Sequence, residues 1–342
     1  MRVVHSLSMQ GNPYFGDLVD GIKARGVHSE TGFLSIKGSL RGTRYDVIHT
    51  HFLHDSPLWC VDDLARLAWY RLLGSRIVKT CHNVKPHSTG HPWVAYLAEA
   101  IVNRVADHVI FFTDGQRQEF CEYYRFTPAN SSIICHPYPD NYCSDVDRSA
   151  AREWLGLAVD DFVYLIFGLV RANKNYDAVI EAFQTQHAEN DKLLVAIGPH
   201  RSNPSEIQAF ERCKSLLERD ERGIVSNLEY MPDEDVPRYF RAADVVIVPF
   251  TGTTSSTSFM LSVSFEIPFI AIGNSFNREV LPERCGLYID TLGELSQAML
   301  RIKACNLQVM QREIASRKPA LSWERVISDH IDVYTKVLNG GS

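Results

Sequence analysis

The sequence lacks several features that define familiar protein classes. None of its eight cysteines forms a CxxC pair, so neither a zinc ribbon nor a thioredoxin-like motif is predicted. No apolar run approaches the roughly 20 residues that cross a membrane. We recognise no signal peptide, because the N-terminus is predicted to begin directly with a strand. Scattered cysteines in such a chain favour reduced thiols and a cytoplasmic location.

The chain also lacks an excess of positive charge. It has 35 Lys and Arg against 41 Asp and Glu, a net charge of −6. Residues 1–150 hold 15 of each sign, so the remainder, with 20 cations and 26 acids, carries the whole −6. Nucleic-acid binding is not predicted, since it favours a basic domain. Ten of the thirteen histidines lie in the first 150 residues, which makes that half the place to look for histidine chemistry.

The order of predicted elements indicates the fold. Short apolar strands alternate with amphipathic helices, a pattern typical of parallel sheets covered by helices on both faces. The alternation stops in the proline-containing stretch His136–Ser149 and then restarts. We therefore predict an α/β chain with two Rossmann-like, doubly wound domains, 1–145 and 146–322, followed by a last helix and tail at 323–342. Ligands of such sheets bind at the carboxyl ends of strands.

One stretch, Asp161–Asn175 (DFVYLIFGLVRANKN), combines the parts of an anion site. A buried strand is predicted to end at Gly168, and Arg171, Lys174 and Asn175 precede a helix that begins near Tyr176. A helix N-terminus offers free N–H groups and a positive dipole, arginine adds a two-pronged donor and lysine a point charge. The pattern favours a diphosphate site; the alternative is a surface loop with two solvated cations.

A second loop of the same predicted sheet is rich in small hydroxyl residues. Phe250–Phe259 (FTGTTSSTSF) follows the predicted strand Asp244–Pro249 and opens a helix. Small side chains let backbone N–H groups approach an anion, and hydroxyls add donors. The loop alone is also explained as a helix N-cap. Together with Arg171 and Lys174 it predicts a phosphate site closed from two sides.

These motifs resemble those of a known family. Gly168–Asn175 is similar to the G-x-x-R-x-x-K-N/G signature of GT-B nucleotide-sugar glycosyltransferases, especially family 4, and Arg241–Ile272 resembles their donor-site segments. Gly11–Tyr14 and Thr80–His87 resemble loops of their first domain, and Asp46–His51 resembles its second strand. Leu321–Leu338 resembles their last helix, which crosses back to the first domain. The set also resembles transferases of bacterial exopolysaccharide and glycolipid assembly.

The resemblance implies a fold, a reaction and a set of site residues. The two domains would face an interdomain cleft, and a hexose would pass from a UDP- or GDP-linked sugar to a hydroxyl of a glycan or lipid-linked saccharide, without cofactor or metal. His82, at a predicted strand end, would contact the donor sugar or its phosphate, and Asn12, His51 and His87 would bind the acceptor. The implied donor-binding residues are Gly168, Arg171, Lys174, Asn175, Tyr230, Thr254, Ser255, Ser256, Thr257 and Ser258.

The chain departs from family 4 at one pair of positions. Thr254 and Ser262 stand where two glutamates eight residues apart are usual. Because those carboxylates belong to retaining relatives, we expect an inverting enzyme, which needs a base beside the acceptor hydroxyl. Asp55, after the predicted strand Asp46–His51, is the first candidate, and Asp114 a weaker one.

Other interpretations of these residues stay open. His49, His51, His54 and Asp55 approximate the spacing of metal-dependent hydrolases, and histidines two apart share a strand face. Loss of the family glutamates would also suit a non-catalytic, nucleotide-sugar-binding partner subunit. Cationic and aromatic residues within Trp59–Lys79 predict either a solvated helix face or a peripheral contact with anionic lipid headgroups.

Overall fold

The computed structural model describes residues 1–6, 13–54, 56–85, 91–142, 146–186, 188–199, 204–252 and 256–340. The chain divides into two compact units. Unit 1 comprises Met1–Pro137 and Ala320–Ser342, and unit 2 comprises Tyr138–Pro319. The seven cysteines in the described ranges are free thiols, and none of the described helices is long and apolar enough to cross a membrane.

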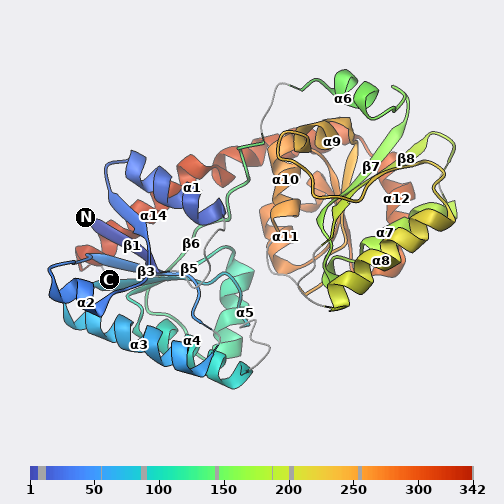
Figure 1. Ribbon diagram of the computed structural model, residues 1–342. Coiled ribbons are helices and arrows are strands. Elements are labelled where there is room, and N and C mark those ends of the chain that lie inside the picture. The colour runs from blue at the N-terminus through green and yellow to red at the C-terminus, as the bar shows by residue number, and fades with distance from the viewer. Residues whose placement is uncertain are drawn as a thin grey trace. The chain divides into compact units, whose positions relative to one another are not determined.

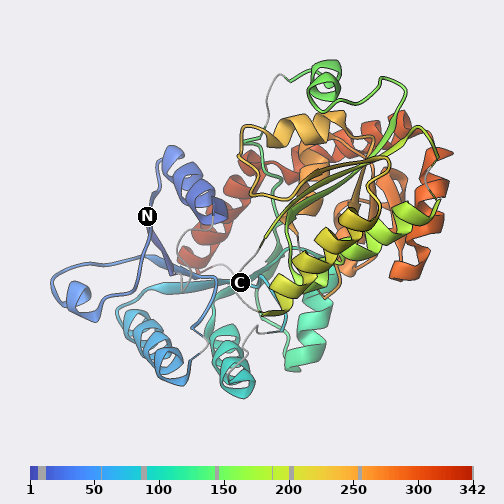
Figure 2. The same ribbon diagram turned by 45° about the vertical axis from the view of Figure 1, so that its right-hand side comes forward.

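Unit 1 is built on a parallel sheet with strand order β2-β1-β3-β4-β5-β6. Its strands are β1 Arg2–Ser6, β2 His28–Thr31, β3 Val47–Thr50, β4 Arg76–Thr80, β5 His108–Phe111 and β6 Ser131–Ile133. Its helices are α1 Pro13–Ala24, α2 Ile36–Leu40, α3 Pro57–Leu72, α4 Pro92–Val105, α5 Asp114–Tyr124 and α14 Trp323–Leu338. Helices α3, α4 and α5 cover one face, while α1 and α14 lie together on the other (Figures 1 and 2).

Unit 2 has a second parallel sheet, with strand order β12-β11-β10-β7-β8-β9. Its strands are β7 Phe162–Leu169, β8 Asp191–Gly198, β9 Ile224–Asn227, β10 Val245–Val248, β11 Phe269–Ile272 and β12 Gly286–Ile289. Its α-helices are α6 Arg148–Trp154, α7 Tyr176–Gln186, α8 Pro204–Arg219, α9 Val236–Ala242, α10 Thr257–Phe265, α11 Ser275–Val280, α12 Leu295–Lys303 and α13 Leu307–Arg317. Its 3₁₀ turns are η1 Ala172–Lys174, η2 Glu283–Cys285, η3 Leu292–Glu294 and η4 Lys318–Leu321, the last of which reaches unit 1.

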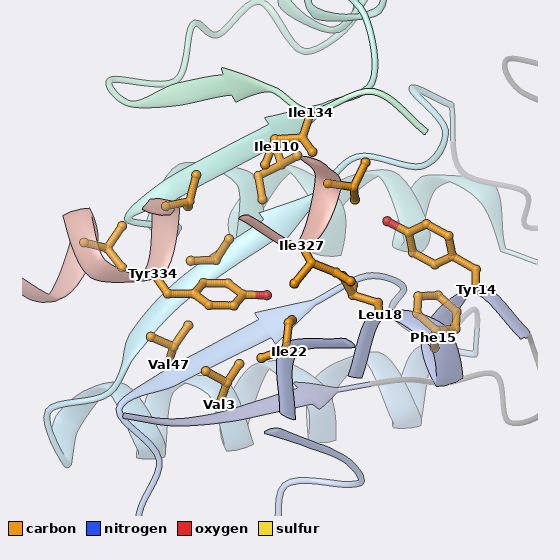
Figure 3. Packing of buried hydrophobic residues seen from close by; sticks show 14 residues of the cluster. Val3, Tyr14, Phe15, Leu18, Ile22, Val47, Ile110, Ile134, Ile327 and Tyr334 are labelled. Carbon is orange, nitrogen blue, oxygen red and sulfur yellow. The ribbon is translucent and has the colours of Figure 1, made fainter. Parts of the chain in front are cut away.

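The last helix completes the core of the first unit, as predicted. Apolar residues recur along one face of α14, and Ile327, Val333 and Tyr334 are buried. Figure 3 shows the Tyr334 side chain beside Val3 and Val47 of the first sheet, in a cluster that also contains residues of α1. A helix distant in sequence is therefore integral to unit 1.

The two-domain parallel α/β fold was predicted correctly, and individual elements differ. Strand β9 ends at Asn227, so Tyr230 lies in the loop that follows it. The short strand β2 and the polar helix α5 carry weak apolar periodicity and were not predicted. In α3, Ala68 and Leu72 are exposed, whereas Tyr70 is buried.

Candidate active site

The carboxyl end of β7 brings a backbone turn against a cationic side chain. Gly168 has φ +116°, a conformation that side chains disfavour. A Cβ there would lie 3.1 Å from Lys174 Nζ and 3.3 Å from Ser258 Oγ. Glycine is favoured at this position because it has no Cβ, which leaves room for both groups.

These residues line a cavity of about 440 Å³ in unit 2. Its size suits a nucleotide or drug-sized ligand, for which about 300–1,000 Å³ is typical. The predicted donor-site residues on its wall are Gly168, Arg171, Lys174, Tyr230, Ser256, Thr257 and Ser258. The structure thus gathers residues that lie up to 90 positions apart in the sequence, while their role in donor binding stays a prediction.

Lys174 supplies an unusual charge to this cavity. Burial and the nearby Arg171 guanidinium lower the pKa of Lys174 to about 8. Its Nζ lies 5.0 Å from the centroid of the Phe250 ring and 5.6 Å from that of Tyr176, so aromatic faces offset part of the lost hydration. No ion pair of Lys174 is found among the described residues, and an anion in the cavity would therefore be attracted strongly.

Asn175 has a different position from the one predicted. It does not line the cavity; its Nδ2 donates to the carbonyls of Asn173 at 3.0 Å and Pro249 at 2.8 Å, and to Thr251 Oγ1 at 3.2 Å. Its φ is +51°, which asparagine tolerates better than most residues. Asn175 ties the loop after β7 to the loop after β10, so we reinterpret it as a positioning residue.

The structure describes the hydroxyl-rich loop at 250–252 and from Ser256 onward. Ser256 is the N-cap of α10, and Thr257 and Ser258 form its first turn on the cavity wall. Thr254 and Ser255 lie outside the described residues. Ser262, at the position of the second family glutamate, is fully buried in α10 and does not reach the cavity.

The cavity also has lining residues that were not predicted from the sequence. Glu229 and Asp233 bring carboxylates to its wall, and Tyr142 donates a hydrogen bond of 3.4 Å to Asp233 Oδ1. Glu229 follows a strand of the same sheet, a signal that could have identified it. Asp233 and Tyr142 carry no such local signal, because only the tertiary fold brings them to this cavity.

Unit 1 contains a chain of buried or half-buried histidines at the ends of its central strands. His5 Nδ1 lies 3.1 Å from His51 Nε2, and His51 Nδ1 lies 3.0 Å from His82 Nε2. His49 lies beside them, with Nδ1 2.7 Å from Tyr334 Oη and Nε2 2.7 Å from Thr80 Oγ1. No sequence motif indicated that His5 belongs to this group.

Burial keeps these imidazoles neutral. It lowers the pKa of His5 to about 3 and of His330 to about 4. Burial also lowers the pKa values of His51 and His82 well below the usual range. Neighbouring histidines add to this effect for both residues, and Lys79 adds more than they do for His82. His82 packs against Phe52, with 4.6 Å between ring centroids. The acceptor role of His51 and the catalytic role of His82 stay predictions.

The remaining predicted first-domain residues are placed as follows. Asn12, Asp55 and His87 lie outside the described residues. Asp114, the alternative candidate for the base, is the first residue of α5. Its carboxylate forms an ion pair with Arg117 at 2.5 Å.

The structure groups the histidines differently from the predicted hydrolase site. His5, His49 and His51 have nitrogen atoms within 4.8 Å of one another, close enough for a metal ion to be considered. However, the hydrogen bonds above already join His5 to His51 and occupy both nitrogens of His49. His54 is not in this group; its Nδ1 donates to Asp63 Oδ2 at 2.8 Å. The arrangement fits an internal hydrogen-bonded cluster better than the predicted ligand set.

The cations predicted to face lipid headgroups are mostly engaged within the unit. Arg71 and Arg76 both pair with Asp107, and Arg66 pairs with Asp62. Lys79 is buried and pairs with Glu99 at 3.1 Å. Most of these cations are therefore paired within the unit, and a contact with lipid headgroups stays a prediction.

Comparison with known proteins follows the same division of the chain. Residues 21–141 match the family described as Glycosyltransferase Family 4, and residues 161–304 match Glycosyl transferases group 1. D-inositol 3-phosphate glycosyltransferases of Mycobacterium tuberculosis and Mycobacterium bovis are 28% identical over 218 residues. The alignment covers 60% of this chain and 42% of theirs, so it spans less than half of those relatives.

Solved structures show the same fold. Sucrose-phosphate synthase from Thermosynechococcus elongatus superimposes with a TM-score of 0.76 at 16% identity, over the whole of both chains. Anabaena Alr3699/HepE in complex with UDP gives 0.76 at 14% identity, covering 98% of this chain and 100% of that one. WaaG, a glycosyltransferase involved in lipopolysaccharide biosynthesis, gives 0.67 at 14%, covering 97% and 99%. With a matching family in each unit and this shared fold, the chain belongs to the GT-B glycosyltransferases.

Proposed function

We propose that the protein transfers a hexose from a UDP- or GDP-linked sugar to a hydroxyl of a glycan or lipid-linked saccharide. Surface polysaccharide or glycolipid synthesis is the process that we infer from the motifs. The observation that carries the proposal is the cavity of unit 2, where Lys174 and Ser258 converge on Gly168. A solved neighbour holds UDP, which supports a uridine nucleotide as the first donor to test.

The residues suggest how the leaving group would be stabilised. Arg171 and Lys174 would meet the diphosphate charge, and the first turn of α10 would offer backbone N–H groups. Charge developing on the departing nucleoside diphosphate is then met by groups already in place. The Glu229 carboxylate would accept hydrogen bonds from hydroxyl groups of the bound donor. No cofactor or metal is required by this scheme, so activity is expected to persist in EDTA.

Calorimetric titration with UDP, GDP and their sugars tests the donor site. Arg171→Ala or Lys174→Ala should weaken donor binding by about 1.5–3 kcal/mol for each lost charge-assisted contact. Lys192→Ala is the matched control, because this lysine lies outside the cavity, in the same sheet. Unchanged nucleotide affinity in both cavity variants would rule out this diphosphate site.

We propose inversion at the anomeric carbon, because Thr254 and Ser262 replace the family glutamates. The base would come from the first unit, with Asp55 as the prediction and His82 and Asp114 as alternatives. NMR of the first product decides the stereochemistry, and a product with the donor's own configuration would contradict inversion. Asp55→Asn should lower kcat by roughly 10²-fold or more, and normal turnover would exclude Asp55.

We also propose peripheral contact with the inner membrane surface, now through apolar rather than cationic side chains. Helices α3 and α4 pack side by side, and both expose apolar residues at helical spacing. Leu58 and Leu72 of α3 are 85% and 83% exposed, and Trp93 of α4 is 67% exposed. The other exposed apolar residues of this face are Val61, Ala65, Ala68, Leu97, Ile101 and Val105. Exposed apolar patches of this kind mark interaction surfaces.

Vesicle co-sedimentation tests this contact. Leu72→Glu with Trp93→Glu should reduce partitioning onto phosphatidylglycerol-containing vesicles at least tenfold, because apolar burial drives interfacial binding. Val159→Glu, at an 89% exposed site in unit 2, is the control. Equal partitioning of both variants and the wild type would contradict a role for the α3–α4 face.

A further inference from the structure

A second cavity lies in unit 1, apart from the histidine chain. Its volume is about 270 Å³, below the 300–1,000 Å³ typical of drug-sized ligands. It opens where β1 and β3 end, at Ser6 and Thr50, which are register partners in the sheet. The other lining residues are Phe33, Leu34, Leu53, His54, Trp59, Asp62, Asp63, Arg66 and Leu67. Ligands of parallel sheets bind at this edge.

One wall of the cavity is held rigidly. The backbone N–H of His54 donates to Asp63 Oδ2 at 3.0 Å, and its ring Nδ1 donates to the same oxygen at 2.8 Å. Cys60 Sγ donates to the His54 carbonyl at 2.6 Å. Because Nδ1 is engaged by Asp63, Nε2 is the free nitrogen of the ring, and no partner for it is found among the described residues.

Two aromatic rings border this wall and stay open to solvent. Phe33 is 55% exposed and Trp59 is 57% exposed. Their ring centroids lie 6.1 Å and 5.6 Å from that of His54. Covering large apolar rings with a ligand is favourable, and rings with little conformational freedom lose little entropy when the ligand binds.

The charges of the cavity narrow the ligand class. Asp62, Asp63 and Arg66 leave one net negative charge, and Arg66 is already engaged by Asp62 at 2.6 Å and by the Leu34 carbonyl. A phosphate or other anion is therefore disfavoured. A purely apolar ligand is also disfavoured, since it would desolvate carboxylates and hydroxyls without replacing their hydrogen bonds. A small, neutral, polyhydroxylated ring satisfies both conditions.

We propose that this cavity binds a neutral pyranose of the acceptor saccharide. The ring's apolar face would lie against Trp59 or Phe33, while its hydroxyls would form hydrogen bonds with His54 Nε2 and donate to the carboxylates. The assignment of this sugar to the acceptor rests on the proposed function. The binding of a neutral sugar rests on the properties of this cavity alone.

Saturation-transfer NMR with methyl α- and β-glycosides of glucose, galactose and mannose tests the proposal. We expect the wild type to bind at least one of them, and Trp59→Ala to weaken that binding tenfold or more. Asp63→Ala should do the same, because it removes the acceptor of both His54 N–H groups. Trp154→Ala, at a half-exposed tryptophan of unit 2, is the control. UDP titration and a melting curve accompany each variant.

Each result has a distinct meaning. No glycoside binding by the wild type, or equal binding by Trp59→Ala, would overturn the pyranose site. Displacement of the glycoside by inorganic phosphate would contradict the neutral-ligand assignment. Glycoside binding without any nucleotide binding would support this site while contradicting the proposed donor function, so the two failures are distinguishable.

Discussion

At the scale of single residues, Lys174 combines burial with a charge that the donor site would use. Because its pKa is lowered to about 8, the free protein holds a mixture of charged and neutral lysine near that pH. A bound diphosphate favours the ammonium form and raises the pKa. Binding near pH 8 should therefore take up protons, and affinity should fall as the pH rises through 8.

Calorimetry of UDP binding in buffers of different ionisation enthalpy measures this uptake. We expect about half a proton per UDP at pH 8, from the linkage between binding and ionisation. Lys174→Arg is the informative control, because arginine stays charged and should abolish the uptake. Uptake that persists in Lys174→Arg would assign the proton to another group.

Gly168 is the second residue with a sharp expectation. Its φ of +116° disfavours any side chain, and a Cβ would press against Lys174 Nζ and Ser258 Oγ. Gly168→Ala should cost roughly 1–3 kcal/mol of strain and displace both groups, so UDP affinity should fall too. Gly252→Ala, also at positive φ but with no atom near the added Cβ, separates the two effects: it should lose stability but keep UDP affinity better.

At the scale of elements, Asn175 joins two loops that come from different strands. Asn175→Ala removes the hydrogen bonds to Pro249 and Thr251 and also strains the backbone, whereas Asn175→Gly removes only the bonds. Both variants should weaken UDP binding, and Ala should lower the melting temperature more, since glycine accepts φ +51°. Thermal unfolding and UDP titration measure these effects; full UDP affinity in Asn175→Gly would show that the bonds do not position the site.

Local sequence signals were enough to predict the β7–α7 junction, because strand, glycine, cations and helix are consecutive. The order of such junctions also predicted the fold. The burial of His49 and His51 was not predictable in the same way, because it depends on α14, some 280 residues later. Likewise, the apolar residues of α3 and α4 have a periodicity that does not reveal which stripe faces solvent. The pairing of His54 with Asp63 depends on the turn before α3, which no local motif specifies.

At the scale of the whole molecule, the buried histidines make the two units respond differently to acid. In unit 1 the pKa values of His5, His108 and His330 fall to about 3 or 4. The unfolded chain binds protons below about pH 6.5 while these folded-state imidazoles do not. The free energy of unfolding is therefore not reduced by these histidines above pH 6.5. It declines as the pH falls toward 4, by up to about 1.4 kcal/mol per pH unit for each histidine.

Hydrogen exchange followed by mass spectrometry distinguishes the units. After correction for the intrinsic exchange rate, protection of β1, β3 and β4 should decrease from pH 7 to pH 5 more than that of β7, β8 and β10. Equal loss in both sheets would point to a general effect of acid rather than to the histidines.

The crossing of α14 back to unit 1 has a consequence for synthesis on the ribosome. Unit 2 ends at Pro319, whereas the core of unit 1 needs Ile327 and Tyr334. Domains usually fold in order from the N-terminus during synthesis, but here unit 2 can complete its fold before unit 1 does. Until α14 has been synthesised, unit 1 has an uncovered apolar surface on α1 and its sheet. Ribosome-bound chains stalled before α14 emerges should resist protease in β7–β12 and be cleaved in β1–β6, and they are the chains on which chaperones should act.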